Sequence, residues 1–92
     1  MNAWADSFNG YIDRLYTDPK DVIFLISDES GVSETGKCNS IYYIVPRTND
    51  NFSEFYSLLL TAAVSKKEVS IQVGSCSGSS RNIATHGSVD FK

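Results

Sequence analysis

Two cysteines, Cys38 and Cys76, are the residues whose chemistry is easiest to define, and each lies in a short polar stretch that contains glycine and serine. Such surroundings place both thiols in loops near strand ends, where disulfide partners commonly meet. A bond between them would close a loop of roughly 40 residues and add roughly 3–4 kcal/mol of stability in the chain-entropy model. The alternative is two free thiols, as in a cytosolic protein. A metal site is disfavoured, because zinc usually takes four ligands and His86 is the only histidine.

The polar segment 75–82 is the second candidate for chemistry. Its hydroxyl, amide and guanidinium groups suit a hydroxyl-rich or carboxylate-bearing ligand, and Arg81 could pair with a carboxylate such as that of sialic acid. An exposed aromatic ring beside polar groups could stack against a sugar ring. The candidate ligand contacts are therefore Ser79, Arg81, Asn82, Tyr43 and Trp4. The alternatives are a solvated hairpin tip for the segment and core packing for the aromatic rings.

No arrangement of residues predicts an enzyme, and no cofactor is expected. The segment 74–78 resembles a nucleophile elbow in outline, but a cysteine takes its centre and no helix is predicted to follow it. The acidic residues Asp28, Glu29 and Glu34 are interpreted as a solubilising loop, because they lack the ligand spacing of a calcium-binding motif. The chain is therefore interpreted as a binding or assembly module.

The charge balance bears on both the partner and the compartment. Eight basic and eleven acidic residues give a net charge of −3. Nucleic-acid binding is disfavoured, because it needs a cationic face that neutralises phosphates. The first twenty residues contain no apolar run of the length of a leader or a membrane span. We expect a secreted or periplasmic mature chain, its leader removed and without membrane insertion. A cytosolic protein that never had a leader is the alternative.

Hydrophobic patterning divides the 92 residues, interpreted as a single domain, into five strands and one helix. The strands are predicted at 11–16, 22–26, 41–45, 69–73 and 83–91. Five consecutive apolar residues at 22–26 indicate a strand that is covered on both faces. Apolar residues at three- and four-residue steps predict an amphipathic helix over 52–65, with Asn51 and Glu54 as a capping box. In the last strand, residues 83, 85, 87, 89 and 91 are expected to share one face.

A helix between the third and fourth of five strands is the layout of the OB-fold, a small Greek-key barrel. We therefore predict a mainly β domain, a five-stranded OB-fold-like Greek-key barrel with one helix between strands 3 and 4. An open meander with a helix, in the α+β class, is the competing arrangement. The strand at 22–26 favours the barrel, because a strand of an open single-layer sheet would alternate in polarity.

Several segments resemble a group of small exported bacterial proteins. The shared features are a cysteine before an aromatic strand (38–45), a helix ending in leucine and alanine (51–63), a basic turn, and a strand (67–73) leading to Cys76. The chain resembles the B subunits of AB-type toxins, especially the subtilase-cytotoxin and pertussis-like kind. This resemblance covers roughly residues 11–91. It implies an OB-fold, a pentameric homo-oligomer, host-glycan or receptor binding, and a toxin catalytic subunit as partner. The chain is shorter than the subtilase-type subunits, and no sugar-contact residue is transferred from them.

Leu58 and Val64 lie off the apolar stripe of the predicted helix and are interpreted as an oligomer interface, as in a ring. Scattered apolar residues on the surface are the alternative. The leading function is therefore an exported carbohydrate- or receptor-binding module that forms a ring. The alternative function is a protein–protein interaction or inhibitory module that docks through an edge strand or through the helix.

Overall fold

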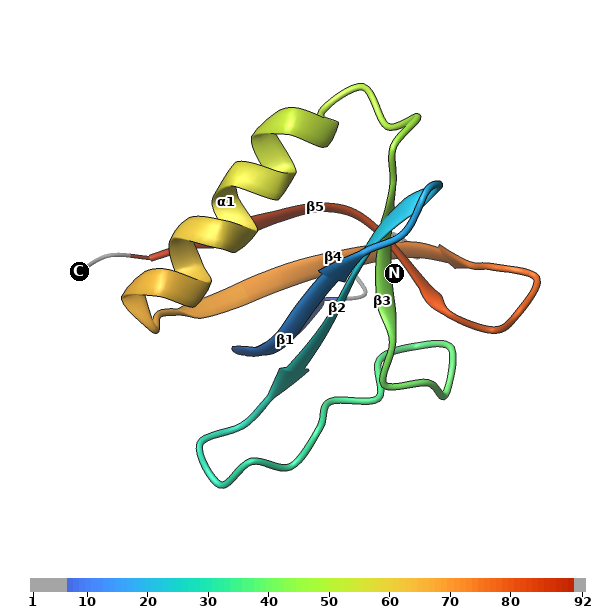
Figure 1. Ribbon diagram of the computed structural model, residues 1–92. Coiled ribbons are helices and arrows are strands. Elements are labelled where there is room, and N and C mark those ends of the chain that lie inside the picture. Colours follow the sequence, from blue (N-terminus) through green and yellow to red (C-terminus); the bar gives the residue numbers. More distant parts are fainter. Residues whose placement is uncertain (1–6, 91–92) are drawn as a thin grey trace.

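The computed structural model describes residues 7–90, which contain five strands and one helix (Figure 1). Their order is β1 (Ser7–Thr17), β2 (Asp21–Ser27), β3 (Tyr43–Pro46), α1 (Phe52–Ser65), β4 (Glu68–Cys76) and β5 (Asn82–Val89). The bounds of α1 agree with the predicted helix. The strands differ from the prediction mainly at their ends, since β1 begins at Ser7 rather than Tyr11 and β3 at Tyr43 rather than Ile41.

The sheet closes on itself in the order β1-β2-β3-β5-β4, because β1 pairs with β4 as well as with β2. Neighbouring strands are antiparallel except β3 and β5, which run parallel. The five-stranded ring and the single helix between its third and fourth strands confirm the predicted mainly β arrangement. The competing open sheet is wrong.

The interior of the ring is filled by aromatic and aliphatic side chains from every element. Phe24 stacks on Tyr43 with ring centroids 5.4 Å apart, and Phe55 of α1 meets Phe24 edge-on at 6.5 Å. Helix α1 contacts β1, β3, β4 and β5 and buries Phe55, Leu59 and Ala62. The helix therefore supplies the apolar face that this small sheet needs to complete its core.

Strand β1 contains one extra residue relative to β2. The register passes from Ile12 directly to Arg14, so Asp13 forms a bulge. Side chains of a strand alternate between its two faces, and an extra residue therefore reverses which positions point inward. Ile12 packs against the core before the bulge and Leu15 does so after it, while Arg14 and Tyr16 point outward.

A second irregularity corrects the predicted faces of the last strand. The register between β4 and β5 passes from His86 to Ala84, which leaves Thr85 as an extra residue, and it also skips Gly74. Ala84 is therefore buried and Thr85 exposed, the reverse of the predicted pattern. Simple alternation fails here because a bulge resets it. Phe91, expected on the same face as Thr85, lies outside the described residues.

Strand β2 is buried on both faces, as its apolar run predicted. Val22, Phe24 and Ile26 belong to the core inside the ring. Ile23 and Leu25 point outward, yet they are only 2% and 8% exposed. A closed sheet has an outer face as well as an inner one, so other side chains must cover these two residues from outside.

The ends of α1 differ from the predicted capping box. Asn51 occupies the N-cap position but makes no side-chain hydrogen bond to the helix. Its Nδ2 instead donates to the carbonyl oxygen of Thr85 at 3.1 Å, so this side chain ties the helix to β5. At the other end Lys66 adopts the left-handed conformation, with φ of 56°, and terminates the helix.

Candidate functional site

The predicted disulfide between Cys38 and Cys76 is present, with the two Cα atoms 5.7 Å apart. It joins the loop before β3 to the end of β4, which are 38 residues apart in sequence. In the chain-entropy model a loop of this length contributes about 4 kcal/mol to stability. The alternative of two free thiols is wrong.

Asn82 lies buried next to this disulfide and makes four hydrogen bonds. Its Oδ1 accepts from the N–H of Cys38 at 2.9 Å. Its Nδ2 donates to the carbonyl oxygens of Thr35, Ser40 and Tyr42 at 3.3, 2.8 and 3.0 Å. Asn82 therefore fastens the long loop between β2 and β3 to β5.

Tyr43 belongs to the same structural cluster. Its ring is fully buried, and its hydroxyl donates to the carbonyl oxygen of Glu34 at 3.2 Å. Burial, and to a smaller degree the charge of Glu34, raises the pKa of Tyr43 above its ordinary value. Gly36, with φ of 67°, closes over this pair, because a Cβ there would lie 2.7 Å from Asn82 Oδ1 and 2.8 Å from the Tyr43 hydroxyl.

These positions correct the predicted set of ligand contacts. Asn82 and Tyr43 lie in the interior, where their polar atoms hold the loop, so we remove both from the set. Ser79 and Arg81 lie in the turn between β4 and β5, Ser79 exposed and Arg81 partly buried. Trp4 lies outside the described residues.

A groove of about 530 Å³ lies between β1, the loop after β2 and the C-terminal end of α1. Ile12, Ala62 and Ala63 form the apolar part of its lining. Tyr11, which is partly exposed, lines this groove and also a neighbouring hollow of about 380 Å³. The two are continuous around Tyr11, and together they form what we call the Tyr11 groove.

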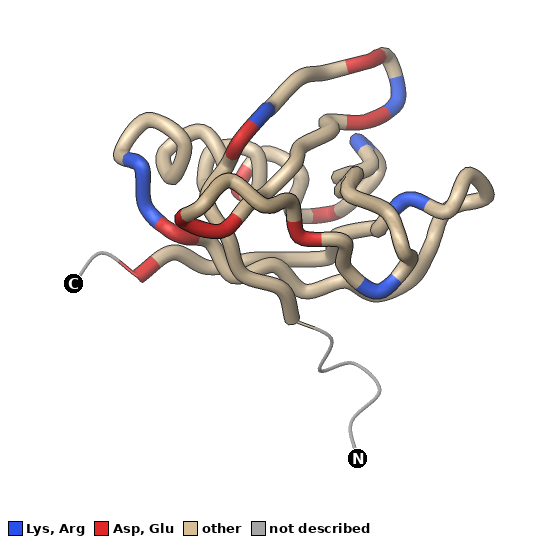
Figure 2. Tube along the Cα trace, turned by 90° about the horizontal axis from the view of Figure 1, so that it is seen from below, with Lys and Arg blue, Asp and Glu red and all other residues tan. Residues whose placement is uncertain are grey.

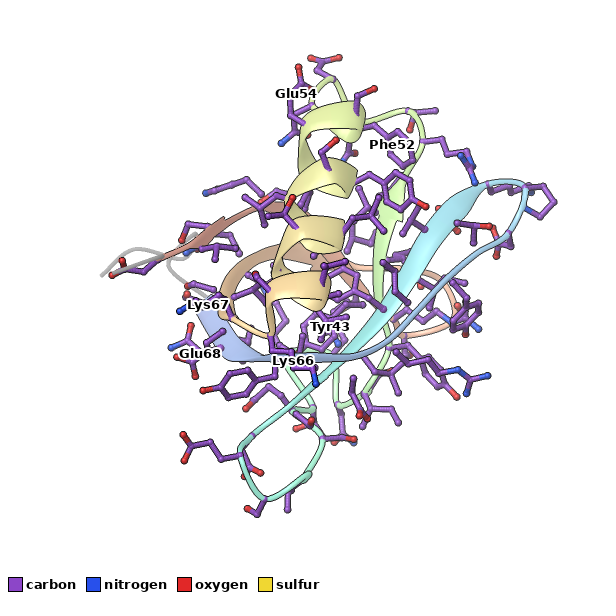
Figure 3. All side chains as sticks on the ribbon, turned by 60° about the vertical axis from the view of Figure 1, so that its left-hand side comes forward. Tyr43, Phe52, Glu54, Lys66, Lys67 and Glu68 are labelled. Carbon is purple, nitrogen blue, oxygen red and sulfur yellow. A yellow bond between two sulfur atoms is a disulfide. The ribbon has the colours of Figure 1, made fainter. Side chains whose placement is uncertain are left out.

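Three carboxylates border the Tyr11 groove. Asp28 and Glu29 come from the loop after β2, and Glu68 comes from the start of β4, where it pairs in register with Tyr11. Figure 2 shows that acidic residues, in red, occur on several separate segments of the chain. Lys66 also lines the groove, and Figure 3 shows it near Glu68 at the C-terminal end of α1. Carboxylates therefore outnumber ammonium groups along the lining.

Asp28 shapes the loop to which it belongs. Its Oδ1 accepts from the N–H groups of Ser30 and Val32 at 2.9 and 3.0 Å, and from the Ser30 hydroxyl at 3.0 Å. These hydrogen bonds, led by the one from Val32, lower the pKa of Asp28 below its ordinary value. Asp28 is therefore ionised at neutral pH and held by its own loop.

The groove continues across the outer face of the ring toward β5. A further hollow of about 160 Å³ shares Asn9 and Glu68 with the Tyr11 groove and adds Ser70, Ser88 and Asp90. The whole path therefore presents carboxylates, an amide and hydroxyl groups beside one aromatic ring. Such groups accept hydrogen bonds from the hydroxyls of a ligand and offer an apolar surface to its C–H groups.

Sequence reasoning missed this groove because its residues come from distant segments. Asn9 and Tyr11 lie on β1, Asp28 and Glu29 on a loop, and Glu68 on β4. Asp28 and Glu29 were interpreted as solubilising residues, and each looks ordinary by itself. The one available signal was an aromatic residue in the first strand.

The outward face of α1 is uncharged beyond its first turn and mixes apolar residues with the hydroxyls of Ser57, Thr61 and Ser65. Val64 is 83% exposed and Leu60, four residues earlier, is 40% exposed. Of the two residues predicted as an oligomer interface, Val64 is thus on the surface, whereas Leu58 is partly buried and packs against the core. The only charged residue in α1 is Glu54, near its start (Figure 3).

Within residues 7–90 no group of three or more histidine, cysteine, aspartate or glutamate side chains is arranged to hold a metal ion. Over the same range, no helix combines the length and the apolar character that crossing a bilayer requires.

Comparison with known proteins finds no match, whether among family models, curated proteins or solved structures. The resemblance to toxin B subunits therefore stays a prediction.

Proposed function

We propose that the chain is an exported carbohydrate-binding module and that the Tyr11 groove is its sugar-binding site. The observation that carries the proposal is a partly exposed tyrosine ring bordered by three carboxylates and the Asn9 amide in one continuous groove. A sugar has an apolar face of C–H groups and an edge of hydroxyls. The tyrosine ring can stack on the C–H face, and the acceptor oxygens can bind the hydroxyls.

The ligand of this groove is a neutral sugar rather than an acidic one. Asp28, Glu29 and Glu68 repel a carboxylate or sulfate, and Lys66 offsets one of these three charges. Carboxylate oxygens are acceptors, so they need a ligand rich in donors. Sugar hydroxyls supply such donors without adding charge.

Two further features support the proposal. The disulfide between Cys38 and Cys76 is typical of oxidising compartments, which favours export. The strand order, with its parallel β3–β5 pair and the helix after β3, agrees with an OB-fold barrel, a fold that binds oligosaccharides in some of its members. Kinship with toxin B subunits would add host glycans as the source of the sugar.

Glycan-array binding by Tyr11→Ala and by the unaltered chain tests the proposal. We expect the unaltered chain to bind neutral glycans and the variant to lose at least about tenfold in affinity, because the stacking ring is gone. Tyr16→Ala is the matched control, since Tyr16 lies on the same strand but beyond the bulge. An array silent toward the unaltered chain, or equal losses in both variants, would contradict the proposal.

Docking onto another protein through α1 is the second candidate function, and the exposed face of the helix favours it. Interface cores are poor in charge, as is this face around Leu60 and Val64. The hydroxyls of Thr61 and Ser65 donate to carbonyl oxygens one turn earlier, at 2.8 and 2.7 Å. Removing water from this face therefore leaves these hydroxyls satisfied. Docking through an edge strand is disfavoured, since each strand has two neighbours in the ring.

The partner in this second function could be another copy of the chain, as in the expected pentamer. Light scattering at micromolar concentration measures this directly. We expect Val64→Glu to shift an oligomer toward the monomer, because a buried charge weakens an apolar interface. Val32→Glu is the matched control, because Val32 is also an exposed valine but lies in a loop. A monomeric unaltered chain would rule out self-association.

A further inference from the structure

A second surface, on the outer face of β1, β2, β3 and β5, is separate from the Tyr11 groove. Two rows of side chains cross it in register. The first row is Tyr16, Ile23, Ile44 and Ile83, which are successive partners across the four strands. The second row is Arg14, its partner Leu25, and then Tyr42 and Arg81, which precede the paired Tyr43 and Asn82. We call this surface the Arg–Tyr face.

The centre of the Arg–Tyr face is closed to solvent. Ile23, Leu25 and Ile44 point outward, yet they are only 2%, 8% and 6% exposed. Other side chains must therefore cover these three residues from outside, so they offer a ligand no open apolar surface. The side chains of the two rows that reach solvent lie toward the ends of the face, where Arg14 is exposed and Arg81 is partly exposed.

An arginine lies over a tyrosine ring toward each end of this face. The Cζ of Arg14 lies 5.2 Å from the centroid of Tyr16, and the Cζ of Arg81 lies 5.2 Å from that of Tyr42. A guanidinium held over a ring in this way can keep N–H donors in its own plane for a bidentate anion. On this side of the ring β2 and β3 separate β1 from β5, so the backbones that carry the two arginines are three strand spacings apart, roughly 14 Å along the sheet.

We propose that the Arg–Tyr face binds a linear anionic glycan, whose sulfate or carboxylate groups pair with Arg14 at one end and Arg81 at the other. The stacked rings hold each guanidinium in place before the ligand arrives, so less side-chain freedom is lost on binding. The sugar backbone between the anionic groups spans the covered centre of the face. This site is independent of the Tyr11 groove, which is acidic and selects against such a ligand.

Two other classes of polyanion fit this face less well. An extended acidic peptide usually binds by adding a strand to a free sheet edge, and the four strands here are paired within a closed ring. A single-stranded nucleic acid stacks its bases on open aromatic faces. Here a guanidinium already covers one face of Tyr16 and of Tyr42.

One acidic residue, Asp18, interacts with an arginine of the face and is also engaged locally. Asp18 lies near enough to Arg81 for the two charges to interact. Its Oδ1 accepts from the N–H groups of Lys20 and Asp21 at 2.9 and 2.7 Å, which fixes the turn between β1 and β2. Asp18 therefore weakens the positive potential at one end of the face without occupying the donors of Arg81.

The proposal is tested by isothermal titration calorimetry of the intact chain with a heparin-derived octasaccharide at low salt. We expect binding that weakens as salt rises, with Arg14→Gln and Arg81→Gln each lowering affinity about fivefold and the double variant about 25-fold. Arg81→Lys keeps the charge but loses the planar fork, so it should also bind more weakly than the unaltered chain. Lys67→Gln, which removes one positive charge at the far end of α1, is the control and should change affinity by less than about twofold.

Three outcomes would overturn the proposal. They are no binding of the octasaccharide at low salt, an equal loss in Lys67→Gln and Arg81→Gln, and displacement of the octasaccharide by a single-stranded oligonucleotide at similar concentration. Tyr11→Ala separates this site from the groove, because it should leave octasaccharide binding unchanged. Circular dichroism of each variant verifies that it is folded.

Discussion

The Tyr11 groove and the Arg–Tyr face are built from the same strand, yet they have opposite electrostatic character. The first half of β1 contributes Asn9 and Tyr11 to a groove bordered by carboxylates. The second half contributes Arg14 and Tyr16 to a face with an arginine toward each end. A tyrosine serves both, open to a ligand in one place and covered by arginine in the other. The neighbours of an aromatic ring, rather than the ring itself, therefore determine which ligand it suits.

The boundary between the two surfaces is the bulge at Asp13. If Asp13 were paired like the other residues of a regular strand, Tyr11 and Arg14 would point to opposite faces of the sheet. The extra residue brings Arg14 and Tyr16 to the outside and turns Leu15 toward the core. One inserted residue thus allows a single strand to contribute to two surfaces of opposite charge while it still fills the interior.

Replacing Leu15 by glutamate should have the largest effect, because the bulge turns this side chain toward the core. A charge placed there, together with the lost leucine, should cost about 4 kcal/mol, a large part of the stability of a small domain. We expect the thermal transition in circular dichroism to fall steeply or to disappear. Arg14→Glu is the matched control, because Arg14 points outward and is exposed, and it should melt within a few degrees of the unaltered chain. Equal losses in both variants would contradict the role of the bulge.

Replacing Asn82 by alanine should have the next largest effect, and it should separate the two surfaces. The change leaves the N–H of Cys38 and three carbonyl oxygens without their buried partner, which should cost about 3 kcal/mol in urea unfolding. Because Asn82 also positions Tyr42, octasaccharide binding should weaken in the folded variant while neutral-glycan binding persists. Ser79→Ala, at an exposed position in the adjacent turn, is the control. Equal loss at both surfaces would show that they are not independent.

Lowering the pH should destabilise the loop of Asp28, which borders the Tyr11 groove. The pKa of Asp28 is lowered by its loop hydrogen bonds, so their stabilising effect is complete above the ordinary pKa of 3.8 and is lost as pH falls through the lower folded value. Carboxyl chemical shifts in NMR should give a midpoint below 3.8 for Asp28. The protection factor of the Val32 amide, which is corrected for the intrinsic pH dependence of hydrogen exchange, should fall as Asp28 is protonated. In Asp28→Asn this pH-dependent loss of protection should be absent. A midpoint above 3.8 would contradict the hydrogen-bonded rim.

Replacing Asp18 by asparagine should have the smallest effect. The amide oxygen can still accept from the turn N–H groups, while the negative charge near Arg81 is removed. Octasaccharide affinity should therefore rise about twofold at low salt, and this gain should vanish at high salt. Neutral-glycan binding at the Tyr11 groove should not change. Weaker octasaccharide binding would indicate that the ligand contacts Asp18 rather than Arg81.

The sequence by itself determined the local elements and their order. The helix over 52–65 and the doubly buried strand around 22–26 were predicted, because each depends on periodicity or on residue type within a short segment. The pairing of Cys38 with Cys76 was predicted because the chain has two cysteines and both lie in polar, loop-like segments. A closed sheet followed from the burial of one strand on both faces.

Only the tertiary structure decided which residues form the surfaces. Asn82 and Tyr43 looked like ligand contacts in sequence, yet the fold turns both inward to hold a loop. Strand register and bulges assemble the Tyr11 groove from three distant segments and place an arginine over a tyrosine twice. Register is set by pairings between strands far apart in the chain and by single extra residues, so no pattern within one segment could reveal it.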